Sequence, residues 1–105
     1  MKIRFTQMAA PLALSALLAA PAWSGEITVY TALEDEEIAA YLEAARAELP
    51  DITINVLRLS TGDLGARLIA ESANPQADVL WGFAVTNILN PAIYDLLEPY
   101  AAEGV

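Results

Sequence analysis

The sequence predicts an α/β fold: a three-stranded parallel βαβαβ unit with flanking helices. Three short runs rich in apolar and β-branched residues are typical of strands, at residues 26–30, 52–59 and 77–81. Between them, residues 34–49 and 62–72 carry apolar residues at helical spacing. Strict alternation of strands and helices indicates parallel strands joined by right-handed crossovers, with helices covering both faces of the sheet.

The first helix, over residues 34–49, follows the first strand after a short loop. Its apolar face repeats with a period of 3.6 and consists of Ile38, Leu42, Ala45 and Leu49. Acidic residues fill its first turn, where the helix dipole favours negative charge. Pro50 ends the helix, because proline cannot donate the next hydrogen bond and restricts the residue before it.

The second strand and the second helix have the same kind of one-sided pattern. The strand at residues 52–59 has one apolar face, made of Ile52, Ile54 and Val56. The helix over residues 62–72 is expected to turn three side chains inward: Leu64, Leu68 and Ile69. The Asn-Pro pair at residues 74–75 closes this helix.

The third strand, at residues 77–81, is apolar enough to be buried on both faces. A loop or helical turn follows through Ile88 and Leu89. Asn90 then caps a last helix over residues 91–97, whose first residue is a proline, as suits that position. Residues 98–105 are expected to be loop. A sheet of three parallel strands has two open edges, and such edges invite pairing with another chain.

The composition excludes several classes of function. The 105 residues include 5 basic and 14 acidic side chains, and the net charge of −9 argues against nucleic acid and anionic lipid as partners. Cysteine and histidine are absent, which removes disulfides, thiolate metal sites and the commonest general base. The sequence contains neither a phosphate-binding loop nor a nucleophile elbow. We therefore expect a binding protein rather than an enzyme, with no catalytic residue, metal or cofactor.

Residues 1–24 are predicted to be a secretory signal peptide. Lys2 and Arg4 precede an apolar run over residues 8–22, and small residues at Ala22 and Ser24 mark cleavage after Ser24. A membrane-anchoring helix is the alternative, but the run is shorter than the ~20 residues that a span needs and is interrupted by proline. The mature chain, residues 25–105, is expected in the periplasm.

The carboxyl ends of the three strands are predicted to lie at one edge of the sheet, where ligands of open α/β folds bind. Ser60, Thr61 and Gly62 begin the second helix there. Unpaired N–H groups, two hydroxyls and a glycine can hold a phosphate, phosphonate or carboxylate group without a basic residue. The alternative is a capping box, in which the Ser60 hydroxyl bonds its own helix.

The ends of the other two strands offer further candidates. Thr31 adds a hydroxyl, with the same capping alternative. Trp81 followed by Gly82 could stack on a ligand or cover an amine, and the alternative is a core tryptophan packed under the last helix.

Charged residues near this edge have both a functional and a structural interpretation. Glu34 or Asp35 could face an ammonium group, although acidic residues in a first helical turn are usually dipole partners in solvent. Arg58 and Arg67 could pair with an anion, but exposure or a surface salt bridge is the expected fate of both.

Beyond the signal peptide, four segments carry a family likeness: ITVYTALEDE, PDITINVLRLSTGDLGARLIAE, NPQADVLWG and LLEPYAAEGV. Together they resemble the extracytoplasmic solute-binding proteins of ABC importers, in the group for iron(III), polyamine, sulfate or phosphonate ligands. Within that group, YTALED, STG and QADVLWG are most similar to the 2-aminoethylphosphonate-binding branch.

The resemblance implies a two-lobed, hinged protein that closes on a small molecule and delivers it to a membrane permease. Residues 25–105 would be the N-terminal part of the first lobe, a partial periplasmic-binding-protein lobe with the second lobe absent, acting as a monomer. Carried over by position, the ligand-binding residues are Thr31, Ala32, Ser60, Thr61, Gly62, Trp81 and Gly82.

Two alternatives stay open at this stage. A protein of the same superfamily could bind iron(III) or a polyamine, such as spermidine or putrescine, in place of 2-aminoethylphosphonate. A small secreted interaction protein that pairs through its open sheet edges would have the same fold and a different function.

The signal peptide gives a first testable prediction. On expression in a Gram-negative host, the exported chain is expected to begin at Gly25, which the intact mass of the periplasmic protein measures. Replacing Ala22 and Ser24 together by lysine should leave the precursor uncleaved, because signal peptidase requires small residues there. Export with the first 24 residues intact in the unaltered chain would contradict the prediction.

Overall fold

The computed structural model describes residues 24–104, so the predicted signal peptide, apart from Ser24, lies outside the described residues. Seven elements follow one another along the chain: β1 (Gly25–Thr31), α1 (Asp35–Glu48), β2 (Ile52–Arg58), α2 (Thr61–Ala70), β3 (Val79–Trp81), α3 (Val85–Ile88) and α4 (Pro91–Tyr94). The predicted α/β fold, with a three-stranded parallel sheet and flanking helices, is confirmed.

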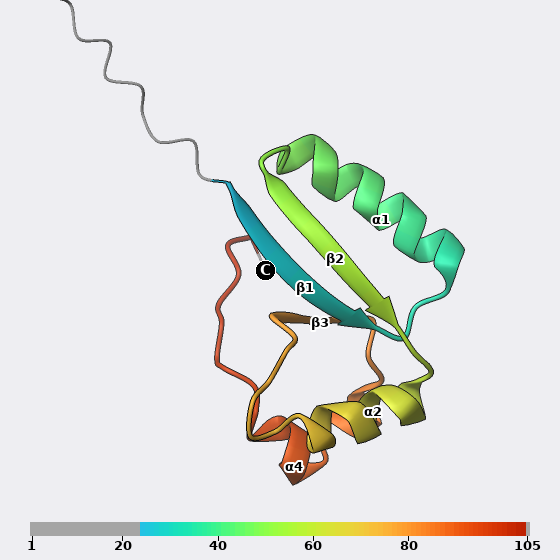
Figure 1. Cartoon of the computed structure of the whole chain (residues 1–105), viewed down its shortest axis with the longest axis vertical. Helices are drawn as coiled ribbons and strands as arrows, with labels where there is room; N and C mark the ends of the chain where they lie inside the picture. The colour runs from blue at the N-terminus through green and yellow to red at the C-terminus, as the bar shows by residue number, and fades with distance from the viewer. Residues whose placement is uncertain (1–23, 105) are drawn as a thin grey trace, which may run out of the picture.

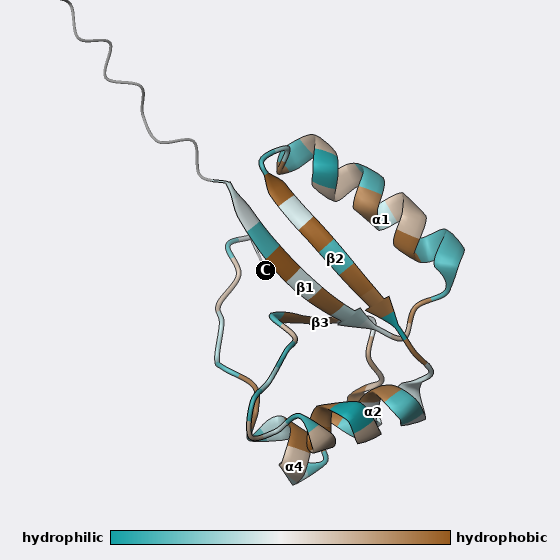
Figure 2. Cartoon of the chain, viewed as in Figure 1, coloured by the Kyte–Doolittle hydropathy of each residue, from teal (hydrophilic) through white to brown (hydrophobic). Residues whose placement is uncertain are grey.

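Strand β1 is the centre of the sheet, with β2 on one side and β3 on the other, both parallel to it. Apolar and polar residues alternate along β1 and β2, as the changing colours in Figure 2 show. Thr31 lies opposite Arg58 in β2 and opposite Trp81 in β3. The three strands therefore end at the same level, and the predicted edge of carboxyl ends is confirmed.

Helix α1 lies on one side of the strands, and α2 and α4 lie on the other (Figure 1). Ile38 in α1 and Val29 in β1 are buried, while Leu42 and Ala45 are half-buried, as their spacing predicts. The inclusion of Leu49 was wrong, since 48% of it is exposed. Leu49 is the C-cap, with φ −127° and ψ 61°, so the chain leaves the helical path before this side chain can join the apolar face.

The main core lies on the other face, between β1, α2 and α4. Its buried residues are Tyr30, Leu64, Leu68 and Ile93. Ile69 was expected to point inward, but 41% of it is exposed. Successive residues of a helix are rotated by about 100°, so Leu64 and Leu68 share one face and Ile69 turns away from it.

Strand β3 is shorter and more exposed than predicted. It covers three residues rather than 77–81, and its first residue, Val79, is 44% exposed. The Asp78 N–H donates to the Thr28 carbonyl (2.8 Å), and the Asp78 carboxylate accepts from the Thr28 N–H (2.8 Å). Just before β3, the Asp78 side chain therefore takes the place of a backbone carbonyl as the acceptor for the Thr28 N–H. Val79 is exposed and Leu80 and Trp81 are only half-buried, so β3 is not buried on both faces.

Two helices also end earlier than predicted, α2 at Ala70 and α4 at Tyr94. After these ends, Ser72 and Leu97 each donate their N–H to the carbonyl three residues back, at 3.2 and 3.1 Å. Such bonds are of the 3₁₀ type, which tightens a chain into a turn instead of continuing an α-helix.

The remaining helical predictions are confirmed. Helix α3 is the expected helical turn before residue 89, and the Asn90 side chain caps α4 by accepting from the Ala92 N–H (3.1 Å). The bounds of β1, α1 and β2 all fall within one residue of those predicted. Among residues 24–104, no helix has the length and apolar character needed to cross a membrane.

A polar cluster on the core face of the sheet connects α2 to β1 through hydrogen bonds and an ion pair. The Tyr30 hydroxyl donates to the Glu71 carboxylate (2.9 Å) and accepts from Nε of Arg67 (3.2 Å), which also pairs with Glu71 (2.8 Å). The hydrogen bond to Tyr30 and the charge of Glu71 raise the pKa of Arg67 above its ordinary value. The phenol itself is 2% exposed, so its hydroxyl depends on these two partners.

The Tyr30→Phe substitution tests this cluster. It removes the hydroxyl and leaves the ring, so the free energy of unfolding is expected to fall by about 0.5–1.5 kcal/mol, the usual contribution of one hydrogen bond. Urea denaturation measures the change. Tyr94→Phe is the matched control, because Tyr94 is 61% exposed and should tolerate the loss of its hydroxyl. If the two variants had the same free energy of unfolding, the proposed contribution of the Tyr30 hydroxyl to the contact between α2 and β1 would be contradicted.

Candidate functional site

The candidate site is the edge where the strands end, which we call the rim and define as residues 31–34, 58–62 and 81–83. The β1–β2 ladder extends into it, because the Leu59 N–H donates to the Thr31 carbonyl (3.1 Å). Helices α1 and α2 both start from it, at Asp35 and Thr61. The rim therefore combines three strand ends with two helix N-termini, and it contains all seven predicted ligand residues.

At the end of β1, Thr31 is fully buried and its Oγ1 accepts from the Leu33 N–H (3.1 Å). The expected capping role of Thr31 was wrong: Glu34 is the N-cap of α1, and its N–H donates to the Glu37 carboxylate (3.1 Å). Ala32 is half-buried and packs against the core. Both residues thus hold the β1–α1 loop in place, with the Thr31 side chain turned away from solvent.

At the end of β2, the structure places Ser60 as the N-cap of α2. Its hydroxyl accepts from the Asp63 N–H (3.2 Å) and donates to the Asp63 carboxylate (2.7 Å), so the capping alternative is confirmed for this residue. Thr61 and Gly62 follow as the first two helical residues, whose N–H groups have no partner within the helix. Gly62 is exposed, with open space where a Cβ would stand. The backbone of these two residues can therefore be approached by an anion.

At the end of β3, Trp81 is half-buried and packs against Tyr41 of α1, with ring centroids 5.0 Å apart and planes tilted by 60°. The alternative placement of this tryptophan under the last helix was therefore wrong. Strand geometry explains the difference, because Trp81 and its neighbour Leu80 point to opposite faces and Leu80 is the one that packs on the core.

Gly82 allows close packing at the rim, a role that was not predicted from the sequence. Its φ is +59°, a left-handed conformation that favours glycine. Leu33 lies directly against it, so that a Cβ on Gly82 would overlap the Leu33 side chain. The β1–α1 loop and the end of β3 therefore pack closely through Leu33 and Gly82, a contact that we call the interlock. Leu33 escaped notice in the sequence because the two residues are far apart along the chain.

Charge beside the rim, in the first turns of the two helices that start from it, is mainly negative. Four acidic residues, 34–37, stand at the start of α1, and Asp63 stands in the first turn of α2. Against them, Arg58 donates from Nε to the Leu33 carbonyl (3.1 Å) and from one Nη to the Glu34 carboxylate (2.7 Å). The expected surface salt bridges are confirmed for Arg58, with Glu34, and for Arg67, with Glu71.

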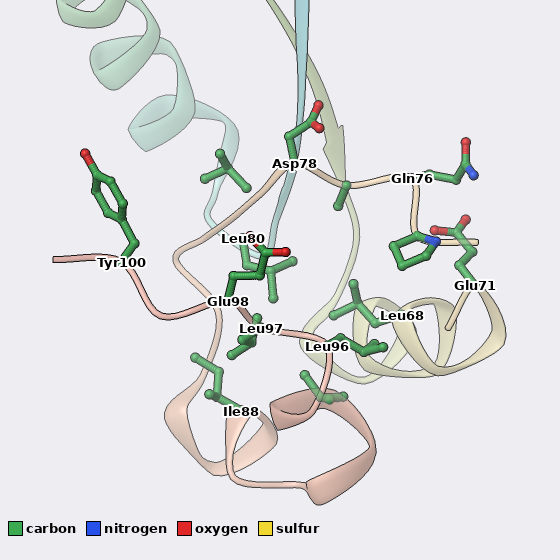
Figure 3. A pocket seen from close by; sticks show the side chains of 14 residues that line it. Leu68, Glu71, Gln76, Asp78, Leu80, Ile88, Leu96, Leu97, Glu98 and Tyr100 are labelled. Carbon is green, nitrogen blue, oxygen red and sulfur yellow. The ribbon is translucent and has the colours of Figure 1, made fainter. Parts of the chain in front are cut away.

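A hollow in the described part of the chain lies away from the rim, at the outer edge of β3. It has a volume of about 860 Å³ and contains none of the seven predicted ligand residues. Figure 3 shows Leu80, Leu96 and Leu97 along it, with the carboxylates of Glu71, Asp78 and Glu98 among the lining side chains. Within residues 24–104, β3 pairs only with β1, so the hollow borders an unpaired strand edge. In the same residues, no acidic cluster is suited to hold a metal ion.

Comparison with known proteins shows a relative that matches most of this chain. The chain is 36% identical over 101 residues to a protein of Sinorhizobium fredii described as "Probable ABC transporter periplasmic-binding protein y4fP". The match covers 96% of this chain and 27% of the relative, so the chain spans about a quarter of the relative's length. No family model matches the chain, and no solved structure matches it. The chain is therefore homologous to part of an ABC transporter periplasmic-binding protein.

The interlock at Gly82 gives a testable prediction. The Gly82→Ala substitution should lower the free energy of unfolding by about 1–3 kcal/mol, because it combines a strained φ with overlap on Leu33. Gly62→Ala is the matched control: it meets open space in a helix and should be neutral or stabilise by up to about 1 kcal/mol.

Chemical denaturation of the two variants checks both values. Adding Leu33→Ala to Gly82→Ala should recover part of the loss, since it removes the overlap and leaves the strained φ. A Gly82→Ala variant as stable as Gly62→Ala would contradict the interlock.

Proposed function

We propose that this chain forms the N-terminal part of the ligand-binding lobe of a periplasmic solute-binding protein, which serves an ABC importer and partners its membrane permease. The observation that carries the proposal is the register of the sheet, which brings three strand ends and two helix N-termini to one rim. Ligands of open α/β sheets bind at such edges. Homology to part of a periplasmic-binding protein supports the same role. This role is binding without catalysis.

For the ligand we propose a small phosphonate, 2-aminoethylphosphonate. Its phosphonate group would accept from the N–H groups of Thr61 and Gly62, where the dipole of α2 favours negative charge. Its ammonium group would face carboxylates at the start of α1, of which Glu34 is the first. A zwitterion suits a rim that has helix-end N–H donors and adjoins the acidic first turns of two helices.

The geometry changes the role of individual residues within this proposal. Because the Ser60 hydroxyl is engaged by Asp63, the proposed anion contact depends on backbone N–H groups more than on that hydroxyl. Thr31, which is buried, and Gly82, which packs on Leu33, support the shape of the rim. Of the seven predicted ligand residues, Thr61 and Gly62 are left to present N–H donors to a ligand, and the half-buried Trp81 lies at the same edge of the sheet.

A polyamine such as spermidine is the second candidate, and the charge of the rim favours it. The Asp63 carboxylate lies at the N-terminus of α2, where it already satisfies part of the helix dipole. Together with the acidic first turn of α1, it would attract a cation more strongly than a simple anion. The two candidates differ in whether helix-end N–H groups contribute to affinity.

A pair of substitutions at Thr61 tests the proposed function. Thr61 is the first residue of α2, where proline is favoured, and Ser60 before it has ψ 155°, which a following proline requires. Thr61→Pro therefore removes one N–H donor while keeping the helix, and Thr61→Ala removes only the hydroxyl. By calorimetry, Thr61→Pro should weaken 2-aminoethylphosphonate binding about tenfold or more, the effect of losing a hydrogen bond to a charged group, and Thr61→Ala should weaken it less.

Spermidine and ferric ion are the comparison ligands, and the unfolding temperature of each variant controls for the integrity of α2. Tight binding of spermidine that Thr61→Pro leaves unchanged, without binding of 2-aminoethylphosphonate, would favour the polyamine candidate. Tight binding of ferric ion alone would contradict both candidates.

A further inference from the structure

The Arg58–Glu34 ion pair spans the rim from the end of β2 to the N-cap of α1. Arg58 makes two different contacts: its Nε donates to the Leu33 carbonyl (3.1 Å), and one Nη donates to the Glu34 carboxylate (2.7 Å). Leu33 is itself held by Thr31 and by its packing on Gly82. The contact with the Leu33 carbonyl therefore fixes the position of the guanidinium. The contact with Glu34 is made by an Nη group, which is the outer end of the guanidinium.

This outer contact is the one that a ligand can replace. The Arg58 side chain is 40% exposed and the Glu34 side chain 75% exposed, so both ends of the pair are reached by solvent. Exposed ion pairs contribute little to stability, so opening one costs little. A guanidinium binds phosphate-like and carboxylate groups through two parallel hydrogen bonds, which makes such a group a strong competitor for Glu34.

No other basic side chain in residues 24–104 is placed to do the same. Arg67 is bound by Tyr30 and Glu71 beside the core. Arg46 lies in the last turn of α1, at the end of the helix away from the rim. An anionic group that gains a charged contact at the rim must therefore gain it from Arg58, where it competes with Glu34.

Taking Arg58 away would leave Glu34 without a cationic partner beside Asp35, Glu36 and Glu37. A simple anion would add repulsion to this cluster, whereas a ligand with its own ammonium group would supply Glu34 with a new cation. We propose that a zwitterionic ligand inserts into the Arg58–Glu34 ion pair, with its anionic head on the guanidinium and its ammonium on the carboxylate. This inference rests on the proposed function and makes Arg58 and Glu34 the residues that select a zwitterion.

Nitrogen-15 NMR of the exported chain tests the insertion, because the Arg58 Nε–H and the rim amides can be followed separately. The probes are 2-aminoethylphosphonate, methylphosphonate, which lacks the amine, and putrescine, which lacks the anion. Probes at about 10 mM detect dissociation constants in the millimolar range. The aminophosphonate is expected to move the Arg58 Nε–H signal together with the amides of Thr61 and Gly62, and to bind about tenfold more tightly than either of the other two.

Two substitutions test the contact of the ammonium group and the contact of the phosphonate group separately. Glu34→Gln should free Arg58 and remove the ammonium partner, so that methylphosphonate gains affinity by several-fold while the aminophosphonate loses its advantage. Arg58→Gln should remove the preference for any phosphonate. Arg46→Gln is the matched control, because it removes one exposed arginine of the same chain away from the rim, and it should bind as the unaltered chain does.

The outcomes distinguish this inference from the proposed function. Aminophosphonate binding that moves Thr61 and Gly62 but leaves the Arg58 Nε–H unchanged would overturn the insertion and keep the proposed function. Equal affinity of the unaltered chain and Glu34→Gln for both phosphonates would overturn the insertion as well. If none of the three probes moves any rim signal, the proposed function fails together with the inference.

Discussion

The parallel register of β1 with both of its neighbours is the constraint on which the rest of the structure depends. Because Thr31 lies opposite Arg58 and opposite Trp81, the three strands end together and the loops that follow them meet. The same register places Tyr30 on the core face, where its hydroxyl reaches α2. A shift of β1 by one residue would exchange these faces, because side chains alternate along a strand.

The rim is built on contacts between loops that are distant in sequence. Leu33 receives a hydrogen bond from Arg58, gives one to Thr31 and packs on Gly82, so it joins all three strand ends. These contacts are satisfied within the chain, and they leave two kinds of group available to a ligand. One is the pair of N–H groups at the start of α2, and the other is the exposed ion pair of Arg58 with Glu34.

The hollow beside β3 has a different character from the rim. It is lined mainly by apolar side chains and borders a strand edge that is unpaired within residues 24–104. Its carboxylates, from Glu71, Asp78 and Glu98, would repel one another across a symmetric contact between two copies of this acidic chain. The rim therefore presents hydrogen-bond donors and charges, whereas the hollow presents a mainly apolar lining.

The element order, the parallel sheet and the edge where the strands end could be predicted from the sequence, because periodicity and helix end signals are local properties. The sequence also offered capping as the alternative role of Ser60, since a capping residue bonds its own helix. Only the tertiary structure decided the placement of Trp81 against Tyr41, the interlock of Leu33 with Gly82 and the exposure of Val79. Each of these depends on which distant residues meet across the sheet, and local spacing in the chain carries no information about that.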